Sequence, residues 1–326
     1  MSDIPLGYYS MKVLKEPLGN DKGALILSQV DSVVEQLPFV KDSFYLIERR
    51  GWRGLNESKY ADIKLVEDLS LWDETIKKFP KSICLDIGPA DFVDISSFRP
   101  INIPKNYDGI QISHWTDFKR PEMLIRAGAL IPHRNFLKLG HFEKGGTQEE
   151  YQYRDLNMRL ARELNANIQF PFSDAETNKD FPRNKEDMNI YINRARLGIL
   201  TTKVEGINRF KMECLSAGIP FLVPNDTSYP TKKHTNQETG AEFEPTPEGL
   251  AKTIEEVLNN LERYNPRGYI ERTTGKPIAL AKLRGALEKV CERDCVQNRF
   301  LDIDWDGRNQ SLIWGENVFK ELKKYG

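Results

Sequence analysis

Two glutamates, Glu205 and Glu213, stand where the types and spacing of residues could do the most chemistry. Glu205 lies in a short loop that contains Gly206 and follows a strand-like apolar run. Glu213 follows about two helical turns later, ~7–12 Å from Glu205 at the rise of an α-helix. This separation suits two separate tasks on one elongated ligand better than one shared proton or one metal ion.

The residues around the two acids predict a strand, a loop, a helix and a second strand. The apolar runs 197–200 and 219–223 are typical of buried parallel strands. Between them, the segment 209–217 is predicted to be helical, because Asn208 can cap its start and Gly218 stands just past its end. The unit is therefore a parallel crossover, which places the loop beyond the carboxyl ends of the strands.

Open α/β sheets bind ligands at that edge. The loop 203–208 lies there at a helix N-terminus, where the amides of Gly206, Ile207 and Asn208 and the helix dipole favour an anion such as a diphosphate. The alternative is that Glu205 and Glu213 are solvated acids on an ordinary crossover.

The stretch from Glu205, EGINRFKMECLSAGIPFLV, resembles the E-x7-E signature of retaining glycosyltransferases of the GT-B fold, family 4-like. It departs from the pattern where Cys-Leu-Ser follows Glu213 in place of Ala-Met-Ala. The resemblance implies that Glu213 hydrogen-bonds the ribose hydroxyls of a nucleotide sugar. It also implies that Glu205 and the amides of Gly206, Ile207 and Asn208 face the donor sugar and its diphosphate. The resemblance implies a front-face, oxocarbenium-like step, so Glu205 is expected to be catalytic without being a nucleophile.

A second segment resembles the family's G-R-x-x-x-x-K-G pattern, whose Arg and Lys neutralise the donor diphosphate. Lys119 matches the Lys and is therefore expected to be catalytic, whereas His114 stands where the Arg is expected. Because an imidazole is mostly uncharged at neutral pH, Arg120 is the expected substitute for the missing guanidinium. The alternative for Lys119 is a solvated lysine at a helix start.

Two further positions complete the expected donor site. Phe172 lies in the segment where the family's nucleotide base sits. Gly19 lies in the loop 15–23, between a predicted strand at 8–14 and a predicted helix at 24–37, and would face the donor across the cleft. A plain connecting loop is an equally good interpretation of Gly19.

The resemblance spans roughly residues 87–261, with four segments in the family's order. It implies an α/β fold of two Rossmann-like domains (GT-B) with a reduced N-terminal domain. We expect an acceptor domain at residues 1–104, a donor-binding domain at 105–277, and C-terminal helices at 278–326 that pack back on the first domain. The loop 49–59, with three arginines and a tryptophan, either grips the acceptor or is solvated.

Composition narrows the class of protein. The 326 residues carry a net charge of −1, so no global basic field indicates nucleic acid. No apolar run is long enough to span a membrane, and the N-terminus lacks the features of a signal peptide. Four irregularly spaced cysteines fit a reduced, cytoplasmic compartment. No metal site is expected, because the D-x-D-x-D-G motif at 302–307 has Ile313 where a calcium loop needs a carboxylate.

The leading hypothesis is metal-independent, retaining transfer of a sugar from a nucleoside-diphosphate sugar, with a UDP-sugar as the expected donor and no bound cofactor. The expected acceptor is a saccharide. The alternative acceptor is a hydroxymethylated pyrimidine in DNA, against which the neutral charge balance weighs. A sugar-nucleotide epimerase and a non-catalytic nucleotide-sugar binder remain as further alternatives.

Overall fold

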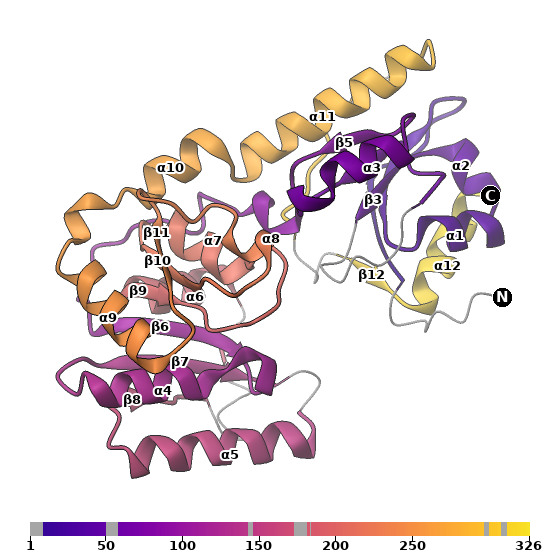
Figure 1. The fold of residues 1–326 in the computed structure, drawn as a ribbon. Coiled ribbons are helices and arrows are strands. Elements are labelled where there is room, and N and C mark those ends of the chain that lie inside the picture. The colour runs from indigo at the N-terminus through magenta and orange to yellow at the C-terminus, as the bar shows by residue number, and fades with distance from the viewer. Residues whose placement is uncertain are drawn as a thin grey trace. The chain divides into compact units, whose positions relative to one another are not determined.

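The computed structural model describes residues 9–49, 58–142, 146–172, 181–182, 184–296, 300–307 and 312–326. The chain divides into two compact units, one formed by Met1–Phe92 with Thr274–Gly326 and the other by Val93–Thr273 (Figure 1). Each unit contains one six-stranded sheet. The division at Phe92 precedes the boundary expected at residue 104, and the residues from Thr274 onward belong to the first unit.

The sheet of the second unit is parallel throughout, in the order β11-β10-β9-β6-β7-β8. In chain order, its strands are β6 (Tyr107–His114), β7 (Phe136–His141), β8 (Ile168–Gln169), β9 (Ala195–Ile199), β10 (Phe221–Pro224) and β11 (Gly240–Phe243). The first three strands run outward in one direction from β6, and the last three run outward in the other from β9. This is the strand order of a doubly wound Rossmann sheet, with its topological switch point between β6 and β9.

Helices cover both faces of this sheet. They are α4 (Pro121–Leu130), α5 (Gln148–Glu163), α6 (Lys185–Asn193), α7 (Arg209–Ser216), α8 (Tyr229–Lys232), α9 (Pro247–Leu258) and α10 (Pro266–Thr273). α4 and α9 pack against each other over one face, in a core that includes Leu197 and Ile199 of β9. Gly198 points to the opposite face, where α7 packs, and a Cβ added there would lie 2.9 Å from Sγ of Cys214. The crossover of strand, loop, helix and strand around Glu205 is therefore confirmed.

The sheet of the first unit has the order β12-β1-β2-β3-β4-β5. Its strands are β1 (Ser10–Lys15), β2 (Gly23–Leu27), β3 (Phe44–Arg49), β4 (Ile63–Leu65), β5 (Ile83–Leu85) and β12 (Ile313–Trp314). Strands β2 to β5 are parallel, whereas β1 pairs antiparallel with both β2 and β12. The helices of this unit are α1 (Val30–Gln36), α2 (Phe39–Ser43), α3 (Trp72–Lys78), α11 (Lys276–Arg293) and α12 (Glu316–Leu322).

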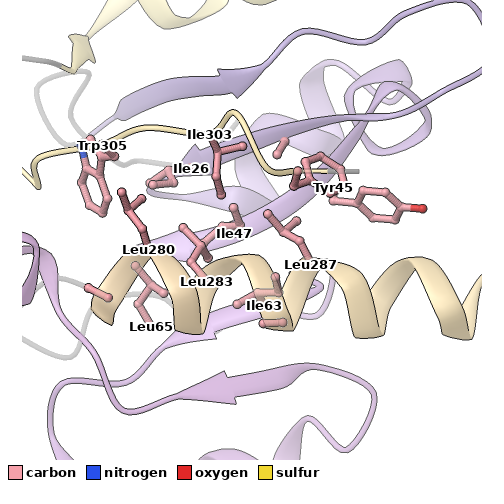
Figure 2. Close-up of a cluster of buried hydrophobic side chains, with 14 of the residues drawn as sticks. Ile26, Tyr45, Ile47, Ile63, Leu65, Leu280, Leu283, Leu287, Ile303 and Trp305 are labelled. Atoms are coloured by element: carbon pink, nitrogen blue, oxygen red, sulfur yellow. The ribbon is translucent and has the colours of Figure 1, made fainter. Parts of the chain in front are cut away.

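Alternate residues of the central strands β2 and β3 enter two separate cores of this unit. Ile26 and Ile47 pack with Leu283 of α11 on one face, as Figure 2 shows. Leu25 and Leu46 pack with α1 and α12 on the other face. Because a fully buried aliphatic side chain contributes about 1.5–3 kcal/mol, the C-terminal helices are integral to the stability of the first unit.

The helix predicted over residues 24–37 is wrong in its first half. Gly23–Leu27 forms β2, a buried strand between β1 and β3, and the helix begins only at Val30. Gly19 consequently lies in the turn of the β1–β2 hairpin, where its φ is +60° and reciprocal 3.0 Å backbone hydrogen bonds join Leu18 and Asp21. The element directly after Gly19 is the strand β2 rather than a helix, and the contact of Gly19 with a donor stays a prediction.

None of the helices in the described parts of the chain combines the length and the apolar character needed to cross a membrane.

Candidate functional site

Lys119 and Glu205 meet at the switch point of the second unit's sheet. The 3-10 turn Asp117–Lys119 follows β6, and the loop 203–208 follows β9, so both segments lie beyond the carboxyl ends of the two strands. Nζ of Lys119 donates a hydrogen bond to Oε2 of Glu205 at 2.7 Å. The two side chains are 10% and 24% exposed. The structure therefore brings together the two residues that the sequence nominates as catalytic.

Thr201, which is fully buried after β9, holds the backbone of Lys119. Its hydroxyl accepts a hydrogen bond from Nε2 of Gln111 at 2.7 Å and donates to the carbonyl oxygen of Lys119. Neither Gln111 nor Thr201 is marked by a sequence motif. Only the pairing of β6 with β9 brings them together, which explains why sequence reasoning missed them.

The guanidinium of Arg120 is engaged within the protein. It donates two hydrogen bonds of 2.9 Å to the carboxylate of Asp226, and its Nε donates to the carbonyl oxygen of Thr201. The hydrogen bonds from Arg120 lower the pKa of Asp226, although burial acts in the opposite direction. With φ at +47°, Arg120 also marks a left-handed turn before α4. This arrangement indicates that Arg120 fixes the segment beside Lys119.

Asn208 caps α7, because its Oδ1 accepts a hydrogen bond from the amide of Lys211 at 2.9 Å. The amide of Glu205 is bonded to the hydroxyl of Ser228 at 3.2 Å. Within the described residues, the amide of Gly206 has no protein acceptor. Gly206 is itself buried at the start of α7, so this N–H group is, in the described part of the chain, a donor without a protein acceptor in the interior. Ile207 and Asn208 are nearly fully buried beside it.

Glu213 lies on α7 and is 7% exposed. Its neighbour Cys214 is fully buried, and both this burial and the charge of Glu213 raise the pKa of the Cys214 thiol. Burying a carboxylate on a short helix costs folding free energy unless the carboxylate is hydrogen-bonded. Its burial makes the interpretation of Glu213 as a freely solvated acid less favourable.

An aromatic row runs along the edge of the sheet from the switch point to α6. It consists of His114, His141, Phe181, Phe172 and Tyr191. The imidazoles of His114 and His141, which end the neighbouring strands β6 and β7, have centroids 3.8 Å apart. Phe172 joins the row with centroids 6.2 Å from Phe181 and 5.8 Å from Tyr191. Sequence reasoning singled out His114 and Phe172 but missed their partners. The contact of His114 with His141 depends on the register of β6 with β7.

Lys138, in the middle of β7, is a buried lysine that sequence reasoning also missed. Its Nζ donates to the carbonyl oxygen and the hydroxyl of Ser113 at 2.9 and 3.0 Å, and it lies 4.7 Å from the centre of the Trp115 ring. Burial, and then the charge of Lys119, lower its pKa well below the usual value. Such strongly shifted lysines cluster at functional sites.

Two apolar side chains that precede the members of the ion pair in sequence are partly exposed, Phe118 at 40% and Val204 at 43%, as is Tyr229 of α8 at 44%. Nζ of Lys119 lies 5.0 Å from the ring centre of Phe118. Among the residues that the structure describes, no group of three or more His, Cys, Asp or Glu side chains is arranged to hold a metal ion. Residues 50–57 of the predicted acceptor loop lie outside the described residues.

No protein-family profile and no curated protein matches this chain. Its fold is nevertheless similar to solved structures. Sucrose-phosphate synthase from Thermosynechococcus elongatus matches with a TM-score of 0.61 at 15% identity, over 81% of this chain and 71% of that one. HepE from Anabaena, solved with UDP and glucose, matches with a TM-score of 0.60 at 13% identity, over 79% and 75%. A glycosyltransferase from Rickettsia africae matches with a TM-score of 0.55 at 14% identity, over 81% and 79%.

These neighbours have the GT-B fold. The predicted fold class, an α/β protein with two Rossmann-like domains of the GT-B type, is therefore confirmed. At such low identity the similarity establishes the fold and leaves the reaction to be inferred from the site.

Proposed function

We propose that this chain is a glycosyltransferase that moves a sugar from a nucleoside-diphosphate sugar to a saccharide acceptor with retention at the anomeric carbon. The observation that carries the proposal is the contact of Lys119 with Glu205 at the switch point of a Rossmann sheet. The solved complexes of HepE with UDP and with UDP-glucose support a UDP-sugar as the donor.

The chemical difficulty of such a transfer is the negative charge that develops on the leaving diphosphate. In our proposal, the ammonium of Lys119 neutralises part of that charge where it forms, and the amide of Gly206 stabilises it by donating a hydrogen bond. In the donor-free state Lys119 is paired with Glu205, so the diphosphate must share or displace that carboxylate. Glu205 is then placed to face the positively charged sugar of an oxocarbenium-like step.

The remaining donor contacts follow from the arrangement of the sheet edge. Glu213 on α7 is proposed to hydrogen-bond the ribose hydroxyls, and Phe172 in the aromatic row is proposed to lie near the base. His114, which stands where the family has an arginine, is proposed to lie beside the diphosphate. Arg120 is proposed to hold Lys119 in place rather than to contact the donor, because its guanidinium already binds Asp226 and Thr201.

The experiment that tests the proposal is incubation of the protein with UDP-, GDP- and ADP-sugars. Each sugar nucleotide would be offered with a set of oligosaccharides or with DNA that contains hydroxymethylated pyrimidines, with and without EDTA. Mass spectrometry would detect the products. We expect a glycosylated oligosaccharide and released UDP, unaffected by EDTA. Formation of glycosylated DNA would show that the acceptor is DNA rather than a saccharide. Conversion of the sugar without an acceptor would indicate an epimerase, and binding without turnover would indicate a non-catalytic binder.

Replacing Glu213 with alanine is expected to weaken donor binding by about 1–3 kcal/mol, since the ribose hydroxyls lose their acceptor. Isothermal titration calorimetry with the donor sugar nucleotide measures this loss. Glu256→Ala on α9, an exposed glutamate of the same unit, is the matched control and should leave the affinity unchanged. An unaltered donor affinity for Glu213→Ala would remove Glu213 from the donor site.

A further inference from the structure

Two hydroxyl groups, one from the N-cap residue of α8 and one from α8 itself, hold the backbone of the loop that carries Glu205. Oγ1 of Thr231 donates to the carbonyl oxygen of Glu205 at 2.8 Å and lies 3.4 Å from that of Gly206. Oγ of Ser228 is bonded to both the amide and the carbonyl oxygen of Glu205. The two hydroxyl oxygens lie 3.0 Å apart. We call Ser228 and Thr231 the hydroxyl pair.

A buried lysine ties α8 to the helix that follows the loop. Lys211 is fully buried, and its Nζ donates to the carbonyl oxygen of Thr231 at 2.8 Å, to Oγ1 of Thr235 at 2.8 Å and to the carbonyl oxygen of Lys233. Lys211 is also the residue whose amide is capped by Asn208 at the start of α7. The loop is thus held at one end by α7 and at Glu205 and Gly206 by the hydroxyl pair.

We propose that Thr231, with Ser228, is a positioning residue for sugar transfer. It fixes the main chain of Glu205 and Gly206 so that the Glu205 carboxylate meets Lys119 while the Gly206 amide stays directed to the diphosphate. This inference rests on the proposed function. No sequence motif indicates this role for α8. The hydroxyl pair contacts the site by bonding to main-chain atoms of the loop.

Loss of the Thr231 hydroxyl is expected to affect the loop, because Thr231 is fully buried and no water can replace the lost hydrogen bond. Displacement of a catalytic group by about 1 Å lowers a rate by about 10²-fold. Ser228 continues to hold Glu205 when Thr231 is changed. A partial displacement of the loop, with a loss of about tenfold in turnover number, is therefore the expected result for Thr231→Val.

The test compares Thr231→Val, which keeps the shape and removes the hydroxyl, with Thr231→Ser, which keeps the hydroxyl and removes a methyl group. We expect the turnover number of Thr231→Val to fall about tenfold, and that of Thr231→Ser to stay within about threefold of the wild type. The melting temperatures of both variants should be similar, because each loses one small buried group. Hydrogen exchange of residues 203–208 should accelerate in Thr231→Val alone.

Equal turnover numbers for the two variants, or a Thr231→Val variant as active as the wild type, would overturn the inference. If Thr231→Val does not fold, Ser228→Ala tests the inference instead, because Ser228 is only half-buried. A wild-type turnover number for Ser228→Ala would then refute the positioning role of the hydroxyl pair. Failure of the proposed function is recognised separately, since the wild type would then transfer no sugar and release no UDP from any UDP-sugar, whether or not it binds UDP. The hydrogen-exchange comparison does not depend on activity.

Discussion

The turnover number for sugar transfer will fall about 10²–10³-fold when Lys119 is replaced by alanine, the range measured when one preorganised stabiliser of transition-state charge is removed. The ammonium lies at the switch point on a side chain that is only 10% exposed, and it is held there through Thr201 and Glu205. Initial rates at saturating donor and acceptor measure this effect. Affinity for the acceptor should change much less, because the charge that Lys119 meets develops on the leaving diphosphate.

The matched control is Lys203→Ala, an exposed lysine at the start of the same loop, which should keep the wild-type turnover number. Lys119→Arg retains the charge with a different geometry and should recover part of the lost rate. A turnover number for Lys119→Ala equal to that of the wild type would remove this lysine from the reaction.

The crossover that carries the site was predictable because its information is local. The apolar runs before and after the loop, Asn208 at the cap and Gly218 beyond the helix each act within a few residues, and the structure has β9, α7 and β10 there. The meeting of Lys119 with Glu205, however, depends on β6 lying beside β9. The resemblance to a known family supplied that juxtaposition, which the residue pattern alone does not.

The helix predicted to begin at residue 24 is wrong at Gly23–Leu27 because of tertiary contacts. Leu25, Leu27, Val30, Val33 and Val34 recur at a spacing that fits one face of a helix, yet the first two residues belong to a strand. Pairing with β1 on one side and β3 on the other, together with burial on both faces, outweighs the local periodicity. The same reasoning moves Gly19 from a loop before a helix into a hairpin turn.

The interpretation of Arg120 shows a different limit. Its place after Lys119 suggested a second cation for the diphosphate, a role that stays a prediction. In the structure its guanidinium binds a carboxylate in a planar, bidentate way, and Asp226 offers that partner from beyond β10. The two residues are 106 positions apart in the chain. Such pairs are invisible to any motif, as are the support of Lys119 by Thr201 and the burial of Lys138.

Glu205→Gln is expected to change product binding and turnover in opposite directions. The donor-free protein pairs Glu205 with Lys119, so a diphosphate competes with that carboxylate for the ammonium. Because a partly exposed ion pair contributes up to about 1 kcal/mol, removing the charge should strengthen UDP binding by about two- to fivefold. The turnover number should nevertheless fall about 10²-fold, since the carboxylate no longer faces the positive charge that develops on the sugar.

Calorimetry with UDP and initial-rate measurements on one preparation of Glu205→Gln give both quantities. A damaged or partly unfolded protein loses both together, so the opposite signs act as an internal control. The Lys119→Ala and Lys119→Ala/Glu205→Gln variants complete a double-mutant cycle, in which the gain in UDP affinity should vanish once Lys119 is absent. If UDP binding weakens in Glu205→Gln, the carboxylate does not compete with the diphosphate. The ion pair would then have to persist in the complex, with Glu205 holding the ammonium in place for its phosphate partner.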